Sequence, residues 1–403
     1  MLVLALAALA LTVAYGIYLS PEWDPSRNDQ VQYQALARGL VERGEYTRAR
    51  LDEPFIPEPL RFPGYALFIA PMCIGGCSMW LITIAQGVLL AGLVLMVARF
   101  ALPLLGVRGA RISAGLVALH PAYAFFAAHA LSDLLATVVG FATVLAATRM
   151  TSAPRSGLAA GAFAAATALV RPFLVYLLPV SALVVAWQRG FRAIAAALAV
   201  AVLLFLVAFA PYVAYMERSF SRPLAGSTGA QLWLAYFQGY DEGSLDPFER
   251  AQADAGRAAL ASFDAITDRV AQVQAFVGLD DDLRTRALAL IAHDPPGFMA
   301  RGLARSVQLW AGDVPVRSED ASAGITALWL MLNLLMLAFG LAGAVLLARR
   351  GGPLASLPLA IVVATWVLSY PLWAEGRFSL PARPFLGIGL AAFFGYLVRE
   401  RRV

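Results

Sequence analysis

The chain has 403 residues, of which 60% are hydrophobic and only 14% are charged, and its formal net charge is +5. Soluble globular domains are roughly half apolar and a quarter charged, so this composition excludes an ordinary soluble protein and indicates a polytopic membrane protein. The positive charge suits phosphates and anionic membrane lipids. Since the sequence shows no soluble basic domain, we expect no nucleic-acid partner.

Ten apolar segments are candidate membrane-spanning helices, since a span needs about 20 apolar residues with a tolerance of several. The first lacks a basic start and a clear cleavage site, which predicts a retained helix and not a removed signal peptide. The sequence therefore predicts an all-α membrane protein with about ten transmembrane helices. The segments are 2–19, 79–98, 112–128, 131–148, 157–170, 173–187, 193–216, 324–348, 354–373 and 383–398.

Two long polar stretches, 20–78 and 217–322, interrupt the apolar segments. They divide the chain into three parts. These are an N-terminal membrane module (1–216) that contains the first loop, a helical loop (217–322), and C-terminal transmembrane helices (323–403).

Both loops have patterns typical of interfacial helices. In residues 27–40, Val31, Ala35, Leu36 and Leu40 recur at helical spacing, which predicts an amphipathic helix at the membrane surface. In the second loop, Asp280–Asp282 are candidate N-terminal caps of a helix.

Arginines in the short connectors predict the orientation, because short basic loops stay in the cytoplasm. The basic connectors share one side only if the chain breaks near Arg171 and Pro172, where proline disfavours helix in the residue before it. Both termini are then cytoplasmic and both long loops extracytoplasmic, in the plasma (inner) membrane of a bacterium. The connectors are 98–111, 148–155, 188–192, 348–352 and the C-terminal tail.

Four polar positions near the outer ends of the predicted spans stand out: Asp29, Asp133, Arg171 and Arg377. The sequence has no phosphate-binding glycine motif, which argues against an ATP-driven pump. Charges are nearly absent from the predicted spans, whereas ion-coupled transporters place them near the midplane. Each position also has an ordinary interpretation. Asp29 could be a solvated acid, Asp133 a helix cap, and both arginines could reach toward lipid head groups.

The order of several motifs resembles the GT-C superfamily of membrane glycosyltransferases. The motifs are "NDQVQYQALARGLVERGEY" (28–46), "EPLRFPGYALFIAP" (58–71), "ALIAHDPPGFMARGLARSVQLW" (289–310) and "GRFSLPARPFL" (376–386). The resemblance is to the family that includes protein O-mannosyltransferases and lipid A aminoarabinose transferases, and it covers most of the chain loosely. The chain is short for that family, so we expect the two loops to recognise the acceptor.

The resemblance implies inverting transfer of a sugar from a polyprenyl-phosphate carrier to an extracytoplasmic hydroxyl on a lipid, glycan or protein. It implies that Asp29 is the catalytic base and that Asp133 is the second catalytic acid. Such a reaction needs a carboxylate to take the hydroxyl proton and fixed positive charge for the departing phosphate. The substrate-binding candidates are Tyr33, Arg61, Tyr65, Arg171 and Arg377.

Neither histidine nor cysteine predicts a metal site. His129 and Asp133 are four residues apart and could face one way on a helix, but two ligands do not make a site. We therefore predict no cofactor, although a divalent metal is left open. Cys73 and Cys77 are too few for a disulfide scaffold or a four-thiolate site, and whether they bond to each other is also left open.

Two other functions fit parts of the pattern. One is a ligase or polymerase that moves a preassembled glycan from a diphosphate carrier. The other is a lipid flippase or transporter without catalysis. Arg171 and Arg377 would serve all three functions, whereas an essential carboxylate at Asp29 favours transfer.

Overall fold

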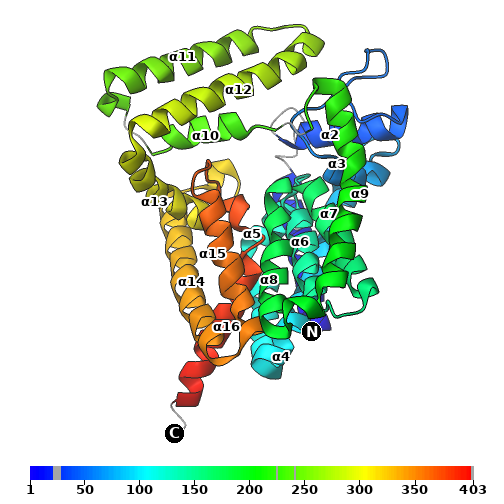
Figure 1. Cartoon of the computed structure of the whole chain (residues 1–403), viewed down its shortest axis with the longest axis vertical. Helices are drawn as coiled ribbons and strands as arrows, with labels where there is room; N and C mark the ends of the chain where they lie inside the picture. Colours follow the sequence, from blue (N-terminus) through cyan, green and yellow to red (C-terminus); the bar gives the residue numbers. More distant parts are fainter. Residues whose placement is uncertain (21–28, 224–225, 240–241, 401–403) are drawn as a thin grey trace.

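The structure, a computed structural model, describes residues 1–20, 29–223, 226–239 and 242–400. Within these residues the chain forms sixteen α-helices and short 3₁₀ segments, and its only extended pairing is an isolated bridge between Thr47 and Pro57. Most helices stand side by side in a bundle. Helices α10–α13 lie over one end, while α1 begins and α16 ends at the other (Figure 1).

Five helices are long and apolar enough to cross a membrane, and shorter apolar helices stand among them. Their outward faces are apolar: Leu203 and Val367, for example, are each 62% exposed. Such faces fit a lipid environment, because water would penalise so much exposed apolar surface. The long helices are α1 (Leu2–Leu19), α4 (Met79–Ala118), Pro172–Arg189 with α8 (Leu177–Arg189), α9 (Ala195–Phe220) and α14 (Ala323–Arg350). The shorter ones include α6 (Asp133–Ala147), α7 (Leu158–Val170), α15 (Leu357–Ser369) and α16 (Arg383–Glu400).

Helix α4 is a hairpin of two helices. At Gly106 the backbone leaves the helical region, with φ 69° and ψ −176°. Helix α1 packs against both halves, because a Cβ added at Gly87 would lie 2.7 Å from Leu9 and one added at Gly115 4.0 Å from Leu4. In a straight helix those two glycines would be about 42 Å apart, whereas Leu4 and Leu9 are only five residues apart. The chain therefore reverses at Gly106.

Several predicted boundaries are wrong. The connector 98–111 is helical on both sides of Gly106, and segment 112–128 is interrupted, with α4 ending at Ala118 and α5 (Pro121–Ala127) following. Pro121 explains the second break, because it disfavours helix at the preceding residue. The break predicted near Pro172 is confirmed: α7 ends at Val170 and Arg171 is extended.

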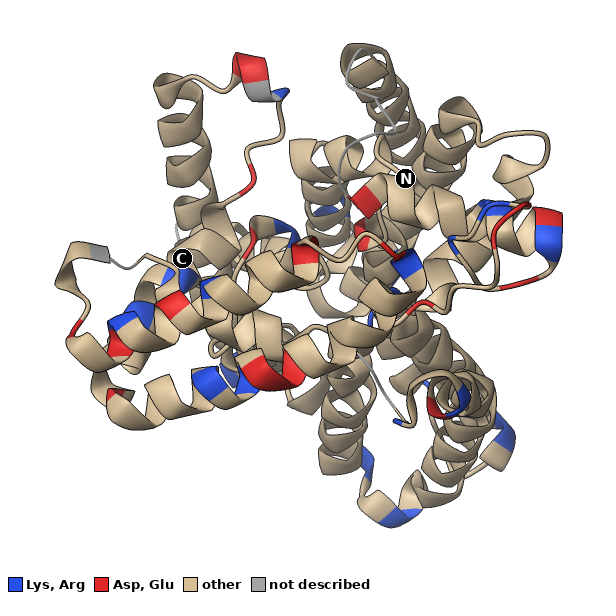
Figure 2. Ribbon diagram, turned by 90° about the horizontal axis from the view of Figure 1, so that it is seen from above, with Lys and Arg blue, Asp and Glu red and all other residues tan. Residues whose placement is uncertain are grey.

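The end of the bundle opposite the two termini consists of α2 (Asp29–Arg43), α3 (Pro63–Ile69), α10 (Thr228–Phe237), α11 (Pro247–Asp264), α12 (Arg269–His293) and α13 (Pro295–Ala311). Acidic and basic residues are interspersed over it (Figure 2). The prediction that Asp280–Asp282 cap a helix is wrong, because α12 runs through them and Asp268 caps it, accepting from Ala271 N at 2.7 Å. Cys73 and Cys77, left open by the sequence, form a disulfide at this end.

The helix predicted in 27–40 exists as α2, although residues 27 and 28 lie outside the described residues. Its buried face differs from the predicted one. Gln30 and Gln34 are buried, whereas Val31 and Leu40 are only partly so. The reason is polar pairing, since Gln30 Oε1 accepts a hydrogen bond from Ala130 N at 2.8 Å. Helix α2 therefore contacts the turn before α6 through the amide of Gln30.

We predict that Gly106→Ala lowers the free energy of unfolding by about 1–3 kcal/mol, because L-residues rarely adopt its backbone angles. Gly92→Ala is the matched control, since Gly92 lies in the same helix with open space around its Cα. Alanine should be neutral or mildly stabilising there. Thermal unfolding in detergent measures both. Equal stability of the two variants would contradict the hairpin.

Candidate functional site

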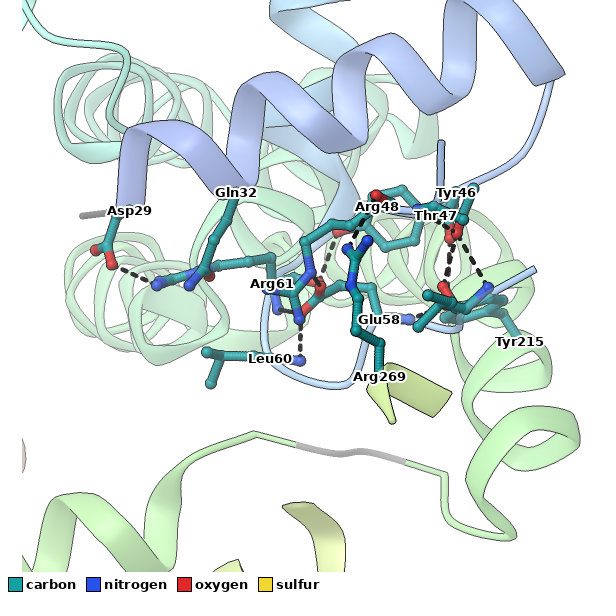
Figure 3. Close-up of polar contacts among 12 residues, drawn as sticks. Asp29, Gln32, Tyr46, Thr47, Arg48, Glu58, Leu60, Arg61, Tyr215 and Arg269 are labelled. Carbon is teal, nitrogen blue, oxygen red and sulfur yellow. Dashed lines mark hydrogen bonds and ion pairs between the residues drawn. The ribbon is translucent and has the colours of Figure 1, made fainter. Parts of the chain in front are cut away.

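Asp29 and Arg377 form an ion pair, although 348 positions separate them in the sequence. Arg377 Nη1 lies 3.1 Å from Asp29 Oδ2, and the Arg61 guanidinium pairs with the other oxygen, Oδ1 (Figure 3). Arg61 is itself fixed by its Nε, which donates to Gln32 Oε1 at 2.8 Å. Both oxygens of this carboxylate are therefore held by guanidinium groups.

The Arg377 segment lies close to the segment that follows α13. Arg377 N donates to Asp313 Oδ2 at 2.8 Å, while its side-chain Nε pairs with Glu375. Gly376 permits this approach, because a Cβ there would lie 2.3 Å from Gly312 O. Sequence reasoning missed both Glu375 and Asp313. Acids are ordinary in polar loops, and only the fold brings these two to Arg377.

Asp133 and Arg171 form a second ion pair, with Arg171 Nη2 2.6 Å from Asp133 Oδ1. Asp133 is 1% exposed, and among the described residues neither of its oxygens accepts a hydrogen bond of normal geometry. Asp133 is therefore not a hydrogen-bonded helix cap. Its buried carboxylate can still accept a hydrogen bond. Phe378 links the pairs, because its ring lies 5.2 Å from Arg171 Cζ and 5.6 Å from Arg377 Cζ.

The two predicted tyrosines lie at different depths. Tyr33 OH donates to Ser132 Oγ at 3.2 Å, and Arg61 Cζ lies 5.4 Å from the Tyr33 ring centroid. Tyr65 is fully buried behind Tyr33, with ring centroids 4.8 Å apart. Tyr33 thus contacts Arg61 directly, whereas Tyr65 packs against the Tyr33 ring.

Glu58, which the sequence analysis did not select, holds Arg61 in place. Its side chain is fully buried, and Oε1 accepts from Leu60 N at 2.8 Å and from Arg61 N at 2.9 Å. Oε2 lies 2.5 Å from Arg48 Nε (Figure 3). The backbone before Arg61 is therefore tied to a buried carboxylate, which directs the guanidinium toward Asp29. The only signal in the sequence was an acid three residues before Arg61.

Burial and charge act in opposite directions at this cluster. Burial alone would raise the pKa of Asp29, but the charges of Arg61 and Arg377 outweigh it and hold that pKa below its usual value. Burial raises the pKa of Glu375 and that of Asp313, and Arg377 offsets only part of the effect. Asp29 is therefore the most firmly ionised of these three carboxyl groups.

The structure does not bring His129 and Asp133 together with a third ligand. Among the described residues, no group of three histidine, cysteine, aspartate or glutamate side chains could hold a metal ion. His129 Nδ1 lies 2.8 Å from the carbonyl oxygen of Phe125.

The sequence matches no protein-family model and no curated protein. Solved structures do match it. The archaeal oligosaccharyltransferase AglB from Archaeoglobus fulgidus, in complex with an inhibitory peptide and a dolichol-phosphate, aligns with 99% of this chain at 13% identity and a TM-score of 0.51. At this identity the match shows that the chain has a fold similar to that of AglB. The alignment covers 52% of AglB, so this chain spans about half the length of that protein.

Two further solved structures match at lower TM-scores. AglB in its apo form aligns with 98% of this chain and 51% of its own, at 11% identity and a TM-score of 0.48. ArnT from Cupriavidus metallidurans aligns with 91% of this chain and 73% of its own, at 16% identity and a TM-score of 0.33.

We predict that Asp29→Asn lowers the free energy of unfolding at pH 7 by roughly 1–2 kcal/mol, because two guanidinium groups lose their counter-charge. The folded-state pKa of Asp29 lies below its unfolded value. Its contribution is therefore present above the unfolded pKa and lost as the pH falls through the folded one. Denaturant titrations at pH 7 and pH 3 should show the gap between wild type and variant closing in acid.

The exposed pair of Asp254 with Arg257 supplies the control. Asp254→Asn should change stability little at either pH. A gap for Asp29→Asn that is constant with pH would contradict the ion-paired carboxylate.

Proposed function

We propose that the protein is an inverting glycosyltransferase that moves a sugar from a polyprenyl-phosphate carrier to an acceptor hydroxyl at the extracytoplasmic face. The observation that carries the proposal is the Asp29 carboxylate held between Arg61 and Arg377 at one end of a GT-C fold. A carboxylate can accept a proton and guanidiniums can bind a phosphate, so the cluster contains both groups that the reaction requires. AglB, which shares the fold, is bound to a dolichol-phosphate.

The proposed chemistry is a single displacement. The acceptor hydroxyl transfers its proton to Asp29 while its oxygen bonds to the anomeric carbon of the sugar. The bond between that carbon and the phosphate oxygen breaks, and its electron pair leaves with the lipid phosphate. Arginine charge stabilises the leaving phosphate. Because the nucleophile attacks opposite the leaving group, the anomeric configuration inverts.

The arrangement further suggests how Asp29 becomes available. Both of its oxygens are paired with guanidiniums, which weakens it as a base. A donor phosphate is a bidentate partner for arginine and competes with Asp29 for Arg61 and Arg377. Donor binding then frees the carboxylate at the moment when the acceptor needs it. In this proposal Tyr33 and Arg171 line the donor site, Tyr65 supports it, and the buried Asp133 orients the acceptor.

The topology belongs to the same proposal. With α4 counted as two crossings, the chain crosses the membrane ten times in the plasma membrane of a bacterium. Residues 20–78 and 217–322 then form the extracytoplasmic loops, between the membrane module 1–216 and the C-terminal helices 323–403. The supporting observation is that α1 begins and α16 ends at the end opposite α10–α13 (Figure 1).

A transferase that uses a diphosphate carrier is the second candidate. Arg61, Arg171 and Arg377 provide three guanidiniums near one another, and AglB is named an oligosaccharyltransferase. Mass spectrometry of the lipid that co-purifies distinguishes the candidates, because the two carriers differ by one phosphate. A lipid flippase would bind the carrier but transfer no sugar.

We predict that Asp29→Asn lowers turnover by roughly 10²–10⁴-fold, the usual contribution of a positioned base. Asp133→Asn is the comparison: if Asp133 orients the acceptor, its loss should raise KM more than it lowers kcat. Transfer of radiolabelled sugar from a polyprenyl-phosphate donor measures both. Wild-type turnover by Asp29→Asn together with an inactive Asp133→Asn would mean that Asp133, and not Asp29, is the base.

The orientation predicts that cysteine at Ser262 in α11 is labelled from outside the cell, whereas cysteine at Ser152 is not. Both serines are exposed, and the test uses a background in which Cys73 and Cys77 are replaced by serine. Whole cells are treated with an impermeant maleimide, and lysed cells show that both sites can react. Labelling of Ser152→Cys but not of Ser262→Cys in whole cells would invert the topology and exclude the proposed function.

A further inference from the structure

A cavity lies at the end of the bundle opposite the carboxylate cluster. Its volume is about 240 Å³, and it is bounded by α4, by the end of α6 and by the short turn before α15. Its polar lining comes from Arg99, Thr148 and Arg149. Apolar side chains, including Phe100, Pro103 and Leu354, complete the walls.

The two arginines share this cavity without an acidic partner. Neither Arg99 nor Arg149 forms a side-chain hydrogen bond or an ion pair within the part of the chain that the structure describes. The sequence explains why, because residues 59–132, 134–216 and 321–374 contain no aspartate or glutamate. Two like charges beside an apolar cavity repel each other, and an anion bound between them would remove that repulsion.

We propose that this cavity binds the head group of an anionic phospholipid. Guanidinium groups form paired hydrogen bonds with phosphate oxygens, and the apolar walls suit the glycerol and the first carbons of the acyl chains. Leu95 and Leu102, exposed on the same helix at 43% and 47%, offer a surface for the remaining chain. A soluble phosphate would use the arginines but leave the apolar walls in water.

The location agrees with the membrane setting. The cavity lies where α4 approaches its reversal at Gly106, near the end of the bundle that carries basic residues without acids. The cytoplasmic leaflet contains anionic lipids that attract arginines at such a position. This inference rests on the proposed orientation but not on the proposed transferase activity, because the carboxylate cluster lies at the other end.

Native mass spectrometry of the full chain, delipidated and then supplied with phosphatidylglycerol or phosphatidylcholine, tests the proposal. Wild type should retain phosphatidylglycerol in preference to phosphatidylcholine and gain thermal stability from it. The double variant Arg99→Gln/Arg149→Gln should bind phosphatidylglycerol roughly 10-fold more weakly or worse. The matched control is Arg155→Gln/Arg192→Gln, which removes two exposed arginines that do not line the cavity. Its affinity should change less than about twofold.

Each other outcome overturns the proposal. An equal loss of phosphatidylglycerol affinity in both double variants would mean that lipid binding depends only on the net charge of the protein. Equal retention of both lipids by wild type would mean that the cavity does not select anions. Stabilisation by glycerol 3-phosphate equal to that by phosphatidylglycerol would make the ligand a soluble phosphate. The thermal unfolding curve of each variant shows whether it is folded. If Arg99→Gln/Arg149→Gln does not fold, Arg99→Lys/Arg149→Lys replaces it as the milder variant.

Discussion

The pairing of Arg377 with carboxylates from three segments determines how the end of the bundle opposite the two termini is assembled. Its guanidinium contacts Asp29 of α2 and neighbouring Glu375, and its backbone N–H donates to Asp313 after α13. A largely buried cation without partners would cost several kcal/mol. The first loop, the end of the second loop and the last connector must therefore meet, and this meeting creates the proposed site.

A second arginine fixes the helices that support this cluster. Arg383 is 3% exposed, and it donates to Asn333 Oδ1 at 2.6 Å, to Trp310 O at 3.0 Å and to Ser379 Oγ at 2.9 Å. These partners belong to α14, α13 and the segment before α16. Arg383, six residues after Arg377, therefore keeps that segment in place.

The sequence was informative where a charge interrupted an apolar pattern. Asp133 and Arg171 stood out for that reason, and the structure places them 2.6 Å apart, although no spacing rule links positions 38 residues apart. Glu375 did not stand out, because it lies in a polar connector. Each of the ten apolar segments contains a helix, but the reversal of α4 depends on one backbone conformation at Gly106, which composition does not reveal.

The same limit applies to the surfaces of helices. The buried face of α2 carries Gln30 and Gln34, because a distant backbone group offers Gln30 a hydrogen bond. A pattern of apolar residues cannot anticipate a polar contact across 100 positions. Likewise α12 continues through Asp280, whose Oδ1 accepts from Ala230 N of α10 at 2.9 Å. The Asp280 carboxylate therefore joins α12 to α10 and does not end a helix.

In the proposed mechanism, Asp29 and the carrier phosphate compete for the same arginines. The direct measurement is the affinity of a polyprenyl monophosphate for wild type, Asp29→Asn and Arg377→Ala, by microscale thermophoresis at constant ionic strength. Removing the competing charge should make Asp29→Asn bind more tightly than wild type, whereas Arg377→Ala should bind more weakly. Weaker binding by Asp29→Asn, or unchanged binding by Arg377→Ala, would contradict the account.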